Sequence, residues 1–266
     1  MPAPLTLPRI SWGSPSASRR ALLVHGLGSS GALMWRLGDA LADAGWHATA
    51  VDLRGHGDAP RSLDYSVAAY GVDLAVTLPE GGGAWDAVIG HSLGGLTAMM
   101  IAARDAKEVG KLMVVDSLPF FGMLFGPSAT VATVEPQAAA MQKMLGAKTS
   151  AEADERTLQI MSATDAGRAQ VKAWTAAANA VVAAQLMYDD MTTDLRPELG
   201  AITAPFTMLY PLDTSVMPAE LVDGLYKSAF SSAKTIRLQR IDGSRHFIML
   251  DQPEAFARAV DAFLAN

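Results

Sequence analysis

The sequence predicts one α/β core domain with a mostly parallel central sheet, flanking helices and an inserted helical cap. Three observations predict it: short apolar runs alternate with longer helical patterns, glycines or prolines stand at nearly every junction, and the alternation stops between residues 117 and 199. Parallel strands need long crossover connections, which explains the alternation. The 266 residues are 50% hydrophobic and 18% charged, enough for one large core with an insertion.

The apolar runs and helical patterns locate the elements of this core. We expect buried strands at 21–25, 47–52, 85–89, 111–115, 206–210 and 235–241. We expect helices at 33–44, 67–78, 95–104, 218–228 and 253–264. All of them lie in residues 1–116 and 200–266, which we assign to the core domain.

Residues 117–199 lack a convincing strand pattern and are predicted to form the cap, or lid. Ala-rich, Met-containing helical segments are expected near 136–145, 151–161, 166–180 and 181–191. Most of these methionines should pack the cap helices together, and the rest can adapt to ligands. An apolar cap favours uncharged, fairly hydrophobic substrates, because burying an unpaired charge costs several kcal/mol. Arg54 and Arg245 are the two cations whose loops could supply a counter-charge.

Composition and charge exclude several classes of function. The net charge of −6, without a Lys/Arg cluster, argues against a nucleic-acid partner. The absence of cysteine excludes disulfides, thiolate metal sites and a cysteine nucleophile. Neither metal-ligand spacing nor a dinucleotide fingerprint is found, so we expect no cofactor. No signal peptide or apolar span long enough for a membrane is recognised, so we expect a cytoplasmic protein. The oligomeric state stays open.

Residues 90–95 read GHSLGG and contain the pattern G-x-S-x-G. The pattern directly follows the predicted strand at 85–89 and directly precedes the predicted helix at 95–104. So sharp a turn strains the serine backbone, and the flanking glycines remove side chains that would clash. The Ser92 hydroxyl is then held above the carboxyl edge of the sheet, beside free N–H groups at the helix start. We therefore predict Ser92 to be a nucleophile.

Three further motifs accompany the serine motif. Residues 24–29 read VHGLGS, residues 52–57 read DLRGHG and residues 242–247 read DGSRHF. On these four motifs the chain resembles the α/β-hydrolase superfamily, in particular its cap-bearing serine esterase, lactonase and perhydrolase-like branch. The resemblance implies the α/β-hydrolase fold and hydrolysis of small, fairly hydrophobic carboxylic esters or lactones through an acyl-enzyme. Two alternatives stay open: a C–C bond hydrolase with the same catalytic residues, and a small-molecule receptor with little turnover.

A serine nucleophile needs an adjacent base at neutral pH, and a third group must orient that base. His246 lies in a polar loop between a predicted strand and the last helix, where this fold presents its base. His25 and His91 belong to the two glycine turns, while His47 and His56 fit surface or hydrogen-bonded structural positions. We predict that His246 is the general base.

The acid in this family stands between the serine and the histidine in the chain. Asp213 follows the predicted strand at 206–210, the usual acid position, and is our predicted acid. Asp116 ends the preceding strand and is the alternative, since some members carry the acid there. A tyrosine and a proline replace the usual glycine before Asp213, which is the one departure from the family pattern.

The resemblance also implies an oxyanion hole made of two backbone N–H groups. One belongs to Leu93, directly after the nucleophile, and the other to Leu27, in the first glycine turn. Each such donor is typically worth about 2.7–4 kcal/mol in the transition state. The side chains of Leu27 and His91 are expected to border the substrate.

Overall fold

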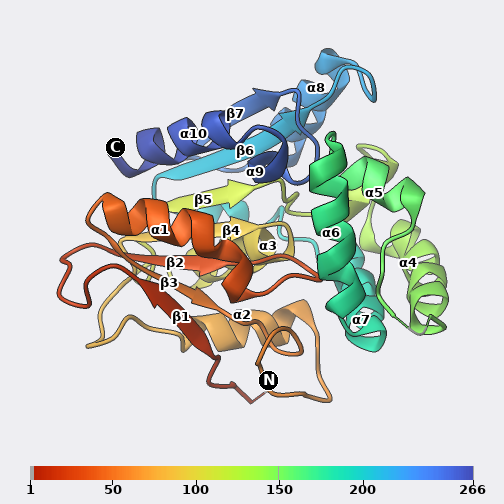
Figure 1. Ribbon diagram of the computed structural model, residues 1–266. Coiled ribbons are helices and arrows are strands. Elements are labelled where there is room, and N and C mark those ends of the chain that lie inside the picture. Colours follow the sequence, from red (N-terminus) through yellow and green to blue (C-terminus); the bar gives the residue numbers. More distant parts are fainter. Residues whose placement is uncertain (1–2, 149, 266) are drawn as a thin grey trace.

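Seven strands form one sheet in a computed structural model that describes residues 3–148 and 150–265 (Figure 1). Their order across the sheet is β1-β3-β2-β4-β5-β6-β7. The strands are β1 (Arg9–Trp12), β2 (Arg20–Val24), β3 (His47–Val51), β4 (Ala87–His91), β5 (Leu112–Val115), β6 (Phe206–Leu212) and β7 (Ile236–Asp242). Only β1 runs antiparallel to its neighbour, so the prediction of a mostly parallel sheet is confirmed.

Helices cover both faces of this sheet, as Figure 1 shows. They are α1 (Trp35–Asp43), α2 (Val67–Ala75), α3 (Leu93–Arg104), α8 (Ala219–Ala229), α9 (Ile248–Asp251) and α10 (Pro253–Ala265). Leu22 and Val24 of β2 pack in the cluster that contains α2, α3 and α8, whereas Ala21 and Leu23 pack with α1 and α10. This alternation follows from the two-residue period of a strand, and it gives the sheet an apolar layer on each side.

The predicted helical insertion lies between β5 and β6. It comprises the short 3₁₀ helices η2 (Phe121–Phe125) and η3 (Leu199–Ala201), and between them α4 (Val131–Gly146), α5 (Glu155–Met161), α6 (Asp165–Ala177) and α7 (Ala180–Thr192). In Figure 1 these helices stand at the carboxyl ends of the strands. The insertion is thereby confirmed, while its limits at 117 and 199 as a separate domain stay a prediction.

Three features of the fold differ from the expected elements. The edge strand β1 and the one-turn helix α9 were not expected, and β6 continues two residues beyond its predicted end, through Pro211. The Leu209 carbonyl faces β5 and the Leu212 carbonyl faces β7, because they accept from the Asp116 and Gly243 N–H groups. Successive residues of a strand direct their backbone N–H and C=O groups to opposite sides, so the backbone nitrogen of Pro211, like Leu209, faces β5. At this level β5 has already ended. The missing N–H of Pro211 therefore costs no ladder hydrogen bond.

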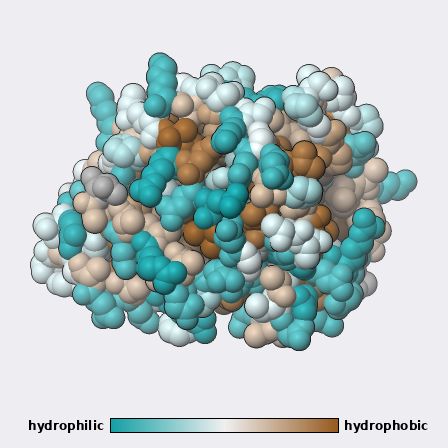
Figure 2. Space-filling view, turned by 90° about the horizontal axis from the view of Figure 1, so that it is seen from above, coloured by the Kyte–Doolittle hydropathy of each residue, from teal (hydrophilic) through white to brown (hydrophobic). Residues whose placement is uncertain are grey.

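The surface is mixed in polarity. Figure 2 shows one face on which apolar side chains lie in hollows bordered by hydrophilic ones. Among the described residues, no helix combines the length and apolar character needed to cross a bilayer.

Candidate active site

Ser92 occupies the turn between β4 and α3, with φ of 53° and ψ of −125°. Among described residues other than glycine, only Ser92 and Asp116 have positive φ. Such backbone strain is costly, of order 1–3 kcal/mol, and it is found preferentially at functional sites. The two strained residues follow the adjacent strands β4 and β5, so they meet at the same edge of the sheet.

Two glycines allow the backbone to pass close to this serine. A Cβ atom at Gly94 would lie 2.3 Å from the Val24 carbonyl oxygen, and one at Gly26 would lie 2.9 Å from Ser92 Cβ. Neither position can hold a side chain without a shift of the surrounding atoms. The glycine turn after β2 therefore packs directly against the predicted nucleophile.

The predicted oxyanion donors come from these two tightly packed segments. Leu93 is the first residue of α3 and Leu27 directly follows Gly26, and neither N–H donates a hydrogen bond within the described ranges. The next N–H, that of Gly28, donates to His56 Nε2 at 3.3 Å. Asp52 Oδ1 accepts from Gly31 N–H at 2.7 Å. The DLRGHG motif thus supports the loop that carries Leu27.

His246 lies in the loop between β7 and α9. Its Nδ1 is 2.7 Å from Asp116 Oδ2. A carboxylate only accepts hydrogen bonds, so Nδ1 carries the proton and Nε2 of the neutral ring is left as the acceptor. The side chains are 22% and 14% exposed, so both remain accessible at the carboxyl edge of the sheet. This is the arrangement that a general base and its orienting acid require.

The structure corrects the expected pairing of Asp213 with His246. Asp213 Oδ1 accepts from the Ser215 hydroxyl at 2.6 Å, and Oδ2 accepts from Arg245 Nε at 2.9 Å. The hydrogen bond from Ser215, then the cationic Arg245, hold the pKa of Asp213 below its usual range. Because β6 runs past the end of β5, Asp213 starts a turn beyond that end. The carboxylate paired with His246 is the alternative, Asp116.

His91 packs against His246, with ring centroids 4.7 Å apart. It is buried, and its Nε2–H donates to the His246 carbonyl oxygen at 3.1 Å. Burial lowers the pKa of His91 to about 3, so the ring is neutral and fixed as a donor. Leu27, the other residue expected to border the substrate, is partly buried against the core. Contact of either side chain with a substrate stays a prediction.

The other histidines also belong to the framework. His25 Nδ1–H donates to the Gly26 carbonyl oxygen at 2.8 Å, and burial lowers the pKa of His25 to about 3. His56 holds the Leu27 loop through Gly28, as described above. His47 differs from expectation, since it is buried and neither of its ring nitrogens has a hydrogen-bond partner.

The two cations named as possible counter-charges are both paired. Arg54 makes a two-point hydrogen bond with Asp73 at 2.7 Å for each contact, and both side chains are almost fully buried. Arg245 is bound to Asp213 and to the Gln159 carbonyl oxygen of α5. Both guanidinium groups therefore stabilise loops of the site.

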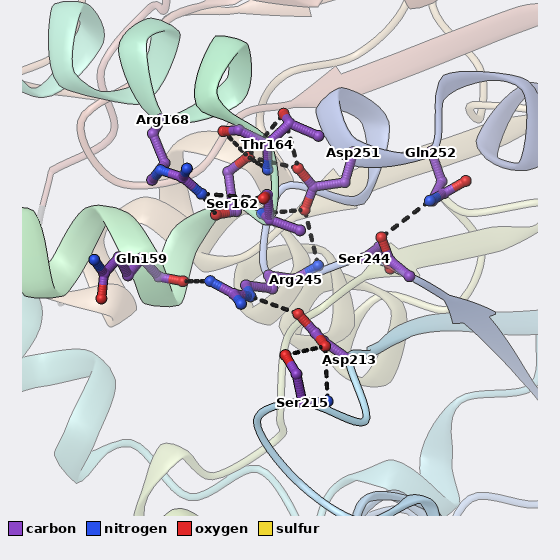
Figure 3. A network of polar contacts seen from close by, with 12 residues as sticks. Gln159, Ser162, Thr164, Arg168, Asp213, Ser215, Ser244, Arg245, Asp251 and Gln252 are labelled. Atoms are coloured by element: carbon purple, nitrogen blue, oxygen red, sulfur yellow. Dashed lines mark hydrogen bonds and ion pairs between the residues drawn. The ribbon is translucent and has the colours of Figure 1, made fainter.

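A buried carboxylate joins the histidine loop to the cap, as Figure 3 shows. Asp251 of α9 accepts from Arg245 N–H at 2.9 Å, on the core side. On the cap side it accepts from the Ser162 hydroxyl at 2.5 Å and from Ala163 N–H at 3.0 Å. The Phe247 N–H adds a bond to the Met161 carbonyl oxygen at 2.9 Å. The residues on both sides of His246 are thus attached to the turn between α5 and α6.

One cap carboxyl group is electrostatically coupled to His246. Asp190 lies on α7 and is partly buried. Burial raises the pKa of Asp190 to about 7; His246 opposes this shift and Asp189 adds to it. The cap, whose inner surface is expected to be apolar, therefore also brings a group that titrates near neutrality close to His246.

Three residues of the site carry no motif and were missed in the sequence: Tyr226, Asp190 and Asp251. Tyr226 donates to Asp116 Oδ1 from α8, far along the chain. Asp190 and Asp251 lie within ordinary helical patterns. Long-range packing brings Tyr226 to Asp116, and it brings Asp190 close to His246. It also joins Asp251 to Ser162 of the cap, so no local signal could have identified these roles.

No group of three or more His, Cys, Asp or Glu side chains in the described part of the chain is placed to hold a metal ion.

The fold and the strained serine turn define a member of the α/β-hydrolase class. The chain matches the family model described as "Alpha/beta hydrolase family" over residues 21–259, and it belongs to this family. The resemblance predicted from the four motifs is confirmed.

Curated relatives and solved structures agree with this assignment. The chain is 37% identical over 105 residues to a pimeloyl-[acyl-carrier protein] methyl ester esterase of Neisseria meningitidis serogroup B / serotype 15, a match that covers 39% of this chain and only 38% of that relative. The enzyme of that name from serogroup C / serotype 2a is 30% identical over 261 residues, covering 91% of this chain and 92% of the relative. The enol-lactonase from Burkholderia xenovorans LB400 superposes with a TM-score of 0.78 at 16% identity, covering 98% and 96% of the two chains. That structural likeness shows the fold alone.

Proposed function

We propose that the chain is a serine hydrolase that cleaves carboxylic esters or lactones through a Ser92–His246–Asp116 triad. The observation that carries the proposal is the 2.7 Å hydrogen bond between His246 Nδ1 and Asp116 Oδ2, at the strand next to the strained serine turn. A histidine oriented in this way leaves Nε2 to act on a serine hydroxyl. The family membership and the esterase relatives support the reaction class.

The reaction proceeds in two halves. His246 Nε2 takes the Ser92 hydroxyl proton while Oγ attacks the carbonyl carbon, and the carbonyl oxygen becomes an oxyanion bound by the Leu27 and Leu93 N–H groups. The tetrahedral intermediate collapses to the acyl-enzyme as the imidazolium returns the proton to the departing alkoxide. A water molecule, deprotonated by His246, then releases the carboxylic acid and restores Ser92. Asp116 stays ionised and stabilises the imidazolium.

The substrate class is proposed from the cap and from the relatives. The relative that spans nearly the whole chain is named for a pimeloyl methyl ester, in which the alcohol part that leaves is small. Apart from Asp190, the Ala- and Met-rich cap helices favour the hydrophobic part of such a substrate, at up to about 0.8 kcal/mol for each methylene buried. We therefore propose uncharged, fairly hydrophobic esters or lactones as substrates.

Ser92→Ala tests this function directly. We expect hydrolysis of p-nitrophenyl butyrate and labelling by a fluorophosphonate probe to be lost, because both need the Ser92 oxygen. Ser16→Ala, at an exposed serine between β1 and β2, is the matched control and should keep both. Circular dichroism checks that the fold is intact.

Two results would contradict the proposal. Turnover of more than a few per cent in folded Ser92→Ala would exclude Ser92 as the nucleophile. Wild-type protein that is labelled at Ser92 but hydrolyses no ester or lactone of a graded acyl series would favour the receptor alternative.

A further inference from the structure

We propose that Tyr226 is a positioning residue that fixes the triad acid and shares its negative charge. The inference rests on the proposed function, since it assigns a second partner to Asp116 within the same triad. Asp116 binds His246 through Oδ2 and accepts the Tyr226 hydroxyl through Oδ1. Each carboxylate oxygen therefore has one strong donor.

Asp116 benefits from such a partner because its backbone fixes the position of the residue but not the plane of its carboxylate. It follows the last residue of β5 and adopts φ of 44°, where its N–H donates to the Leu209 carbonyl oxygen at 2.8 Å. The carboxylate can rotate about two side-chain bonds, and rotation would break the bond to His246. The Tyr226 hydroxyl holds the opposite oxygen and so fixes the plane of the carboxylate.

The Tyr226 ring is itself held rigidly. It is buried and stacks on Tyr210 of β6, with ring centroids 4.4 Å apart and an angle of 23° between the planes. The Tyr210 hydroxyl donates to Asp223 Oδ1 at 2.9 Å, and Asp223 Oδ2 accepts from Arg240 at 2.9 Å. Burial, and then the negative charge of Asp116, raise the pKa of Tyr226 well above its usual value. The hydroxyl therefore keeps its proton and serves as a donor.

Loss of the Tyr226 donor alters the charge distribution of the Asp116 carboxylate and, through it, the protonation of His246. A carboxylate without the Tyr226 bond carries more localised negative charge, and this favours the imidazolium form of His246. The other titratable groups that face the pair are His91 behind the base, which is neutral, and Asp190 on α7. Neither can replace the missing hydroxyl, since neither is bonded to Asp116.

Tyr226→Phe removes the hydroxyl and keeps the stacked ring. We expect kcat for p-nitrophenyl butyrate to fall about 10-fold to 100-fold, as for the loss of one hydrogen bond to a charged group. We also expect the acidic limb of the kcat/KM profile to move to higher pH by roughly half a unit to one unit. A residue that only stabilised the fold would lower the yield of active protein without moving the profile. Tyr210→Phe is the matched control, because it removes the outer hydroxyl and leaves Tyr226 and Asp116 bonded.

A second measurement does not depend on turnover. In protein labelled with carbon-13 at tyrosine Cζ, one of the five tyrosine signals should move when Asp116 is replaced by Asn. The proposal is overturned if folded Tyr226→Phe keeps the wild-type pH profile, if Tyr210→Phe shifts it equally, or if no tyrosine signal responds to Asp116→Asn. Failure of the wild-type protein to hydrolyse any ester or lactone, by contrast, would refute the proposed function and leave the tyrosine signals to decide whether the contact exists.

Discussion

Two neighbouring strands of the sheet each lead into an aspartate, and the two carboxylates have different partners. Asp116, after β5, binds the ring of His246 and the hydroxyl of Tyr226. Asp213, after β6, binds Arg245 and Ser215. Arg245 and His246 are adjacent in the chain, so the two aspartates hold consecutive residues of one loop. One carboxylate touches the proposed base and the other fixes the residue before it.

The difference arises from strand length and register. Val115, the end of β5, pairs with Leu209, whereas β6 continues for three more residues to Leu212. At about 3.3 Å per residue, the Asp213 turn begins roughly 10 Å beyond the end of β5. Equivalent positions after two strands are therefore not equivalent in space. A catalytic role that is assigned to the residue after a given strand therefore has to be checked against how far that strand extends past its neighbours.

Of the variants that test the difference between the two aspartates, Asp116→Asn should lower kcat the most. An amide in place of the carboxylate can turn its NH₂ group toward His246, which favours the wrong imidazole tautomer. We expect kcat to fall by about 10³-fold to 10⁴-fold, as for the corresponding change in other triads. Steady-state kinetics with p-nitrophenyl butyrate measures it, with circular dichroism as the check on folding.

Asp213→Asn is the matched variant at the other strand end and should have a much smaller effect. The loss of a partly exposed ion pair with Arg245 costs about 1 kcal/mol. For a domain of this size we expect a decrease in Tm of about 2 °C and a kcat within about threefold of wild type. If Asp213→Asn lowers kcat more than Asp116→Asn does, Asp213 is the acid and the geometry of the pair has been misinterpreted.

An effect confined to charged substrates should come from Asp190, the third carboxyl group near the proposed base. Its pKa of about 7 means that it is mostly protonated at pH 6 and mostly anionic at pH 8. An anionic cap repels an anionic substrate, so kcat/KM for a succinyl half-ester should fall severalfold relative to the butyrate ester as the pH rises from 6 to 8. Asp190→Asn should remove this pH dependence of the ratio. A ratio that stays constant in wild type would show that Asp190 does not sense the acyl group.

Local sequence was sufficient for the fold and for the positions of Ser92 and His246, because a glycine turn and a polar loop at strand ends are short-range signals. It was insufficient to tell which carboxylate pairs with His246. Pro211 argues against a strand in any local interpretation, and only the end of β5 makes it compatible with β6. The edge strand β1 was missed because it has only four, largely exposed residues, so its polar–apolar alternation is too short to predict a strand. Tyr226 and Asp251 depend on contacts between distant segments.

The shared carboxylate of Asp251 has a consequence for cap exchange between family members. It is 7% exposed, and its donors on the cap side come from residues 162–164. A graft that replaced those residues without matching donors would leave a buried charge partly unpaired, which typically destabilises by several kcal/mol. The useful crossover points for chimeras therefore lie outside the turn between α5 and α6. In a chimera, that turn should therefore be kept together with the core domain rather than exchanged with the cap helices.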